Sequence, residues 1–293
     1  MIFNRMRPSG LTSIGVFGVL MFMLTGCTEN PFSDGDKVSA SQISGQVTLS
    51  HETDFSGIYV WLEGFNISTL TDSGGEFTLS LPPPASQSGG EGVNGDFNLY
   101  FYVANFSLDS VGVTILNGDL VKSTEEIDET GSIKENITLS KLLNVEVAPK
   151  QESASASEST IILVDVTLTS PRIDPVKTVM LRADARSSLP LSALFLKKVD
   201  TQEEIIKMVD IGSHINLVNF IDKDLTLTYE LRFDLLPGEL PAGEYQIIPY
   251  VMVGNMNPPV ELINSLGDDV HEYHADFLNL PFKRSGGEFI IFE

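Results

Sequence analysis

The feature that most constrains the fold is a repeated alternation of apolar and polar residues with a period of two. From Gln42 onward, short segments place apolar side chains at every second position, and turn residues separate them. Because successive side chains of a strand point to opposite faces, this pattern predicts strands with one buried face. In the first half the predicted inward residues are Ile43, Val47, Leu49, Ile58, Val60, Leu62, Phe77, Leu79, Leu81, Phe97, Leu99, Phe101, Val103, Val111, Val113, Ile115, Ile137 and Leu139.

The alternation resumes after a stretch that has no period. Residues 148–159, APKQESASASES, are small and polar, which is typical of a linker. Further strands are predicted around Ile162, Val164, Val166, Leu168, Val179, Leu181, Ala183, Ala185, Leu225, Leu227, Tyr229, Leu231 and Phe233. We therefore predict an all-β protein with two β-sandwich domains, at 42–147 and 160–293.

Smaller elements of the second domain are less regular. Residues 200–211, DTQEEIIKMVDI, fit a short helix or a hairpin, and we favour the hairpin. Residues 260–269, VELINSLGDD, predict one or two helical turns. The segment PAGEYQIIPYVMV, residues 241–253, resembles a late strand of an immunoglobulin-like or fibronectin-like module.

The first domain carries a family resemblance. The segments ISGQVTLS, GIYVWLEG and STLTDSGGEFTLSLP resemble the carboxypeptidase regulatory-like domain, a transthyretin-like sandwich. The resemblance covers residues 42–147 and implies a non-catalytic module. Independently of it, Asp72 to Gly75 predicts a hairpin turn, since Asp caps a turn with its own side chain and Gly accepts a positive φ. The Gly/Ser-rich 84–96 and the acidic 123–135 are predicted to be loops.

The N-terminal sequence is typical of an export signal and not of a folded domain. Arg5 and Arg7 precede an apolar stretch that is too short to span a bilayer, and the stretch ends on Leu24-Thr25-Gly26-Cys27. This ending resembles the lipobox of bacterial lipoproteins, which implies cleavage of the signal peptide 1–26 and covalent lipid on Cys27. A lone exported thiol favours lipidation over an ordinary secretory signal. Residues 27–41 would then be the lipidated Cys and a flexible tether to the membrane.

The net negative charge of the chain limits which classes of partner it can bind. Without residues 1–26 the chain has 16 basic and 40 acidic residues. Such a surface repels nucleic acid and anionic headgroups, so we expect no nucleic-acid partner and membrane contact only through the lipid. Because Thr28 rather than Asp follows the Cys, the lipoprotein resemblance implies an outer-membrane location in the cell envelope.

Two groups of residues are candidates for binding. If the apolar residues of their strands face inward, Tyr59, Trp61, Tyr100 and Tyr102 face outward. If the two strands are also neighbours, these four residues form a strip suited to sugar rings. The alternatives are that this face packs against the second domain or a loop, or that the residues are separately exposed. An envelope protein or a polysaccharide would be the partner.

The segment GDDVHEYHAD, residues 267–276, contains the other candidate. His271, His274 and Asp276 are metal-ligand types, but His-x-x-His lies on one face only in a helix, and Ala275 stands where a zincin motif needs its second His. A solvated acidic loop is the alternative. No nucleophile elbow, phosphate loop or dinucleotide fingerprint is present. We therefore expect a non-catalytic binding or scaffolding module without a cofactor; a metal-dependent enzyme or metal-binding protein using 271–276 and a purely structural spacer are the alternatives.

Overall fold

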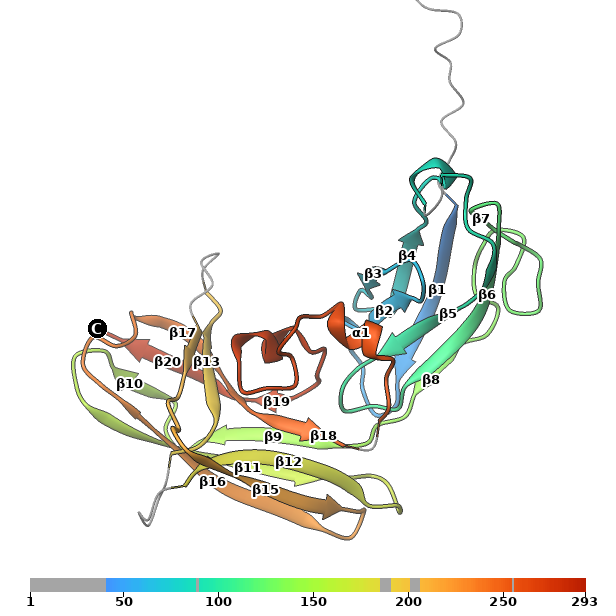
Figure 1. Cartoon of the computed structure of the whole chain (residues 1–293). Helices are drawn as coiled ribbons and strands as arrows, with labels where there is room; N and C mark the ends of the chain where they lie inside the picture. Colours follow the sequence, from blue (N-terminus) through green and yellow to red (C-terminus); the bar gives the residue numbers. More distant parts are fainter. Residues whose placement is uncertain (1–40, 88–89, 185–190, 201–205, 255) are drawn as a thin grey trace, which may run out of the picture. The chain divides into compact units, whose positions relative to one another are not determined.

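A computed structural model describes residues 41–87, 90–184, 191–200, 206–254 and 256–293 of the chain (Figure 1). These described residues form one compact unit. Nearly all regular structure in it is β-strand, which confirms the predicted all-β fold. Cys27, the signal peptide and most of the predicted tether lie outside the described residues.

The first group of strands builds two sheets. One has the order β4-β1-β8, and the other has the order β3-β2-β5-β6-β7. β1 pairs antiparallel with β4 and parallel with β8. The bounds are β1 Gln42–Leu49, β2 Tyr59–Leu62, β3 Ile67–Leu70, β4 Glu76–Ser80, β5 Gly95–Tyr102, β6 Asp109–Leu116, β7 Asp119–Leu120 and β8 Ile137–Leu139, with a 3-10 turn η1 at Pro84–Ser86.

The predicted inward residues of these strands form one hydrophobic cluster. β4 alternates strictly, with Phe77 and Leu79 buried between exposed neighbours. Phe77 meets Phe101 of the other sheet with their ring centroids 5.8 Å apart. The period-two pattern is therefore confirmed as the pattern of this core; of the predicted inward residues, only Phe97 is half-buried.

The predicted turn before β4 is present. The Oδ1 atom of Asp72 accepts hydrogen bonds from the backbone N–H groups of Gly74 and Glu76, both at 2.9 Å. Gly75 has φ +79°, and a Cβ atom there would lie 2.0 Å from the carbonyl oxygen of Val47. Gly is thus required both by conformation and by the close approach of β1.

The second group of strands builds three sheets, with the orders β16-β11-β9-β19, β15-β12-β18 and β10-β20-β17-β13-β14. They enclose a second cluster centred on residues such as Val164, Phe195, Phe233 and Ile247. The bounds are β9 Asn144–Pro149, β10 Ser153–Ser155, β11 Thr160–Thr169, β12 Val176–Ala183, β13 Leu194–Lys198, β14 Ile206–Met208, β15 His214–Ile221, β16 Thr226–Leu235, β17 Gly243–Pro249, β18 Val251–Val253, β19 Ser285–Gly286 and β20 Glu288–Phe292, with α1 Val260–Asn264 and a 3-10 turn η2 Ala275–Asn279.

The boundary between the two groups differs from the prediction. β9 begins within the range assigned to the first domain, yet it pairs with β11 and β19, and its Val145 and Val147 belong to the second cluster. The predicted linker 148–159 contains the end of β9 and all of β10, which pairs with β20. Its small polar residues form an edge strand because ladder hydrogen bonds use only the backbone.

The second group of strands also contains a predicted hairpin, a predicted helical turn and a predicted alternating strand. β14 lies in the segment 200–211 that was predicted to be a hairpin, but its antiparallel partner β13 precedes that segment, and residues 201–205 are outside the described part. The helical turn is α1. β12 departs from a single alternating face: Val179 is half-buried, while Met180 and Leu181 are both buried. The inward face therefore changes at that point of the strand.

Candidate functional site

The four aromatic residues of the predicted strip do lie on neighbouring strands. In the antiparallel pairing of β2 with β5, Trp61 is opposite Tyr100 and Tyr59 is opposite Tyr102. The Trp61 and Tyr100 ring centroids are 5.9 Å apart. The condition for a strip, that the two strands are neighbours, is therefore met.

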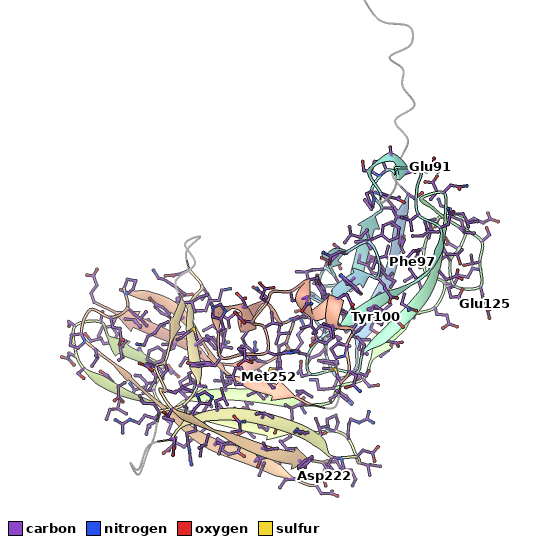
Figure 2. The ribbon with its side chains drawn as sticks, viewed as in Figure 1. Glu91, Phe97, Tyr100, Glu125, Asp222 and Met252 are labelled. Atoms are coloured by element: carbon purple, nitrogen blue, oxygen red, sulfur yellow. The ribbon has the colours of Figure 1, made fainter. Side chains whose placement is uncertain are left out.

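The strip is nevertheless covered. Tyr59, Trp61 and Tyr102 are only 7%, 2% and 2% exposed, and they belong to the second hydrophobic cluster rather than to the first. Tyr100, labelled in Figure 2, is half-buried against the same cluster. The expectation of an outward, sugar-binding strip is thus corrected in favour of the packing alternative, because a buried ring has no free face for a ligand.

The cover is the segment of α1 and its flanks. The hydroxyl oxygens of Tyr59 and Ser265 are 2.9 Å apart, and Ser265 donates to the carbonyl oxygen of Leu262 at 2.6 Å. Because the hydroxyl of Ser265 has a single hydrogen and donates it to Leu262, the hydroxyl of Tyr59 donates to the Oγ atom of Ser265. The Nε1–H of Trp61 donates to Oδ1 of Asn66 at 3.2 Å. Both polar tips are satisfied inside the protein.

The histidine segment forms a different group from the predicted one. The side chains that could share a metal ion are Asp269, His274 and Asp276, whose ligand atoms all lie within 4.8 Å of one another. His271 is not in this group within the described residues. His274 is the N-cap of η2, and its Nδ1 accepts the backbone N–H of Asp276 at 3.3 Å.

The same segment is also a packing element. Tyr273 places its hydroxyl between β13 and β14, where it accepts from the N–H of Leu194 at 3.1 Å and lies 2.6 and 2.9 Å from the carbonyl oxygens of Leu194 and Val209. Burial raises the pKa of Tyr273 above its usual range. Tyr250 donates to the carbonyl oxygen of His271 at 2.6 Å, and burial raises the pKa of Tyr250 to about 12. The segment 267–276 is therefore anchored through Tyr273 and the carbonyl of His271, while its other charged side chains, Asp268, Asp269, His271, Glu272 and His274, are exposed apart from the half-buried Asp276.

A polar group that the sequence analysis missed lies near the C-terminus. Lys283 and Arg284 line a pocket together with Glu52, Asp54 and Lys141. Asn105 fixes the backbone there: its Nδ2 donates to the carbonyl oxygen of Lys283 at 2.9 Å, and its Oδ1 accepts from the N–H of Lys283 at 3.0 Å. The available signal was two adjacent basic residues in a chain of net charge −22.

The loops predicted at 84–96 and 123–135 are held by single side chains. Gln87 is buried and donates to the carbonyl oxygens of Pro82 and Gly118, both at 2.7 Å. Asp128 accepts from the N–H groups of Thr130 and Ser132, both at 2.8 Å. Among the residues that the structure describes, no helix is long and apolar enough to cross a membrane.

Comparison with known proteins gives few matches. No protein-family model matches the chain, and no curated protein does. Among solved structures, the major pilin subunit BcpA of Bacillus cereus, in a D312A form, is 11% identical, with 73% of this chain and 68% of that chain covered and a TM-score of 0.27. The Bacillus anthracis TIE protein is 10% identical, with 75% and 49% covered and a TM-score of 0.23.

Proposed function

We propose that this chain is a non-catalytic cell-envelope lipoprotein whose folded part binds or scaffolds an envelope protein or a polysaccharide. The observation that carries the proposal is the sequence Leu24-Thr25-Gly26-Cys27, which closes an apolar stretch and contains the only Cys of the chain. Several acyl chains on Cys27 would give a stable anchor, because a single chain holds only weakly. The first strand begins at Gln42, so a short polar segment separates lipid and fold.

A non-catalytic role is supported by the surroundings of the histidines. All four, His51, His214, His271 and His274, are exposed. A general base is normally held in a concave, partly dry site together with its orienting partners. His271 and His274 lie at the surface, and the Nδ1 atom of His274 caps η2. These side chains are more suited to a surface module than to proton transfer.

The anchor is tested by fractionation. Cys27→Ser is expected to move the protein from the membrane fraction to the soluble fraction, whereas Thr28→Ser, one residue later, leaves it in the membrane. Mass spectrometry of the N-terminal peptide should show acyl chains in the wild type only. Thr28→Asp should shift the protein from outer to inner membrane on a density gradient. A Cys27→Ser variant that stays membrane-bound would refute the anchor.

The binding role is tested separately. Cross-linking of the tagged protein in cells, followed by mass spectrometry, should capture either one dominant envelope protein or polysaccharide fragments. The Cys27→Ser form is the control, because capture that needs the anchor depends on location. If neither form captures anything above an unrelated lipoprotein, the chain is a spacer.

Metal binding is the second candidate, favoured by the short ligand-atom distances within Asp269, His274 and Asp276. A stoichiometric zinc ion retained after dialysis against a weak chelator, and lost in Asp276→Asn, would support it. Retention in both forms would place the ion elsewhere.

A further inference from the structure

A pocket of about 320 Å³ brings together residues that lie far apart in the chain. The segment after β1 contributes His51, Glu52 and Asp54, and Lys141 follows β8. Lys283 and Arg284 come from the segment before β19. The volume is at the lower end of the range for small-molecule sites.

The charges of this pocket do not cancel. Lys141 forms an ion pair with Glu52, and Lys283 pairs with Asp54 at 3.1 Å. Both carboxylates thus have a lysine partner. Arg284 has no ion-pair partner among the described residues, so the pocket keeps one excess positive charge in a chain of net charge −22.

The guanidinium of Arg284 is held in place without being satisfied. Its Cζ atom lies 4.4 Å from the ring centroid of Phe282 and 5.8 Å from that of Phe277. Its Nε atom is buried and has no hydrogen-bond partner among the described residues. Burial lowers the pKa of Arg284 to about 10, so the group is cationic at neutral pH.

An unpartnered, partly desolvated guanidinium costs free energy in the free protein, which a ligand would recover. Stacking on Phe282 occupies a face of the guanidinium, whereas the N–H donors of its two Nη groups lie in the plane of the group and can still reach a ligand. A planar carboxylate matches such a donor edge with two parallel hydrogen bonds. A single excess charge also suits a monoanion better than a phosphate dianion.

We propose that this pocket binds the carboxylate of a sugar-sized hydroxy acid, of the uronic acid class, through Arg284. The volume fits one such unit, and the paired lysines, His51 and Ser285 offer polar walls for its hydroxyl groups. Because the rest of the surface repels anions, affinity comes from contacts inside the pocket, with a Kd on the order of 1 mM for the isolated acid. The inference goes beyond the proposed function and does not depend on lipid at Cys27.

The test is isothermal titration calorimetry of the purified full-length protein with D-glucuronate, in a buffer free of carboxylate and phosphate. D-glucose is the neutral control ligand, and inorganic phosphate is the control anion. We expect glucuronate to bind with one site per chain and glucose not to bind. Arg284→Gln should weaken binding by at least about tenfold, the value of a charge-assisted hydrogen bond.

Two further variants make the result specific. Arg172→Gln is the matched control, since Arg172 does not line the pocket, its side chain is 39% exposed and Asp174 is its partner at 3.8 Å; it should leave glucuronate binding unchanged. Arg284→Lys keeps the charge without the planar donor edge, and it should still weaken binding. Circular dichroism melting establishes that each variant is folded; should Arg284→Gln fail to fold, Arg284→Lys decides.

The proposal is overturned if glucuronate does not bind the wild type, if it binds the Arg284 variants equally well, or if phosphate binds and glucuronate does not. None of these results bears on membrane fractionation of Cys27→Ser.

Discussion

Replacement of Trp61 by Ala separates packing from ligand binding at the aromatic residues of β2 and β5. The side chain is 2% exposed, lies beside Tyr100 with ring centroids 5.9 Å apart and the ring planes tilted by 37°, and donates its Nε1–H to Asn66. It belongs to the hydrophobic cluster that the second group of strands builds. The substitution therefore removes a buried contact between segments far apart in sequence, rather than an exposed binding surface.

The size of the effect follows from burial. A Trp side chain buries about 150–250 Å² of surface, which at about 25 cal/mol per Å² corresponds to roughly 4–6 kcal/mol as an upper estimate. Measured Trp→Ala substitutions in cores cost about 3–5 kcal/mol, and we expect Trp61→Ala to fall in that range. Trp61→Phe keeps most of the apolar contact and should cost about 1–2 kcal/mol.

Urea unfolding followed by far-UV circular dichroism measures this effect, since the chain has only one Trp and loses its fluorescence on substitution. Phe220→Ala is the control aromatic deletion, because Phe220 is 61% exposed and should change the free energy of unfolding by less than about 0.5 kcal/mol. The reasoning is refuted if Trp61→Ala costs less than about 1 kcal/mol, or no more than Phe220→Ala.

Three shorter predictions test other parts of the fold. Gly75→Ala should destabilise by about 1–3 kcal/mol more than Gly57→Ala, because both have a positive φ but only the Gly75 Cβ meets the Val47 carbonyl; paired urea curves give the difference. Hydrogen bonds, the largest from the hydroxyl of Thr130, lower the pKa of Asp128, so its contribution to stability holds above about pH 4 and is lost as pH falls through the lowered value; acid titration of Asp128→Asn should show a smaller loss. Asn105→Ala should cost about 1–3 kcal/mol, since it leaves part-buried backbone groups at Lys283 unpaired, and hydrogen exchange there should accelerate.

The strands were predictable because burial of one face imposes a local period. β4 alternates as the sequence indicated, and the turn before it uses Asp72 and Gly75 in the expected roles. The expectation that Tyr59 and Trp61 of β2 face solvent was wrong because it used the same period. A period of two tells which side chains share a face, but it contains no information on what covers the second face. For Tyr59 that cover is Ser265, about 200 residues later in the chain.

The predicted linker and the segment 267–276 show a second limit of predicting structure from composition and period. Ser153–Ser155 is a strand because its backbone pairs with β20, and its polar composition does not prevent this. In the segment 267–276, the spacing of His271 and His274 placed them on one face only if the segment were a helix. The chain instead turns at η2, so that the N–H of Asp269 reaches Asp276 at 3.4 Å. Irregular segments bring residues together at spacings that neither regular period predicts.

The C-terminal segment joins these observations into one physical picture. The segment from Val260 to Arg284 covers the aromatic face of β2 and β5. Its residues Tyr273 and Phe277 pack beside β13. The end of the same segment forms one wall of the Arg284 pocket. Lys283 is tied to Asn105 on one side and to Asp54 on the other. A ligand held by Arg284 would therefore contact parts of both groups of strands at once. Because binding to the folded form alone adds stability, glucuronate should raise the melting temperature of the wild type and not of Arg284→Gln.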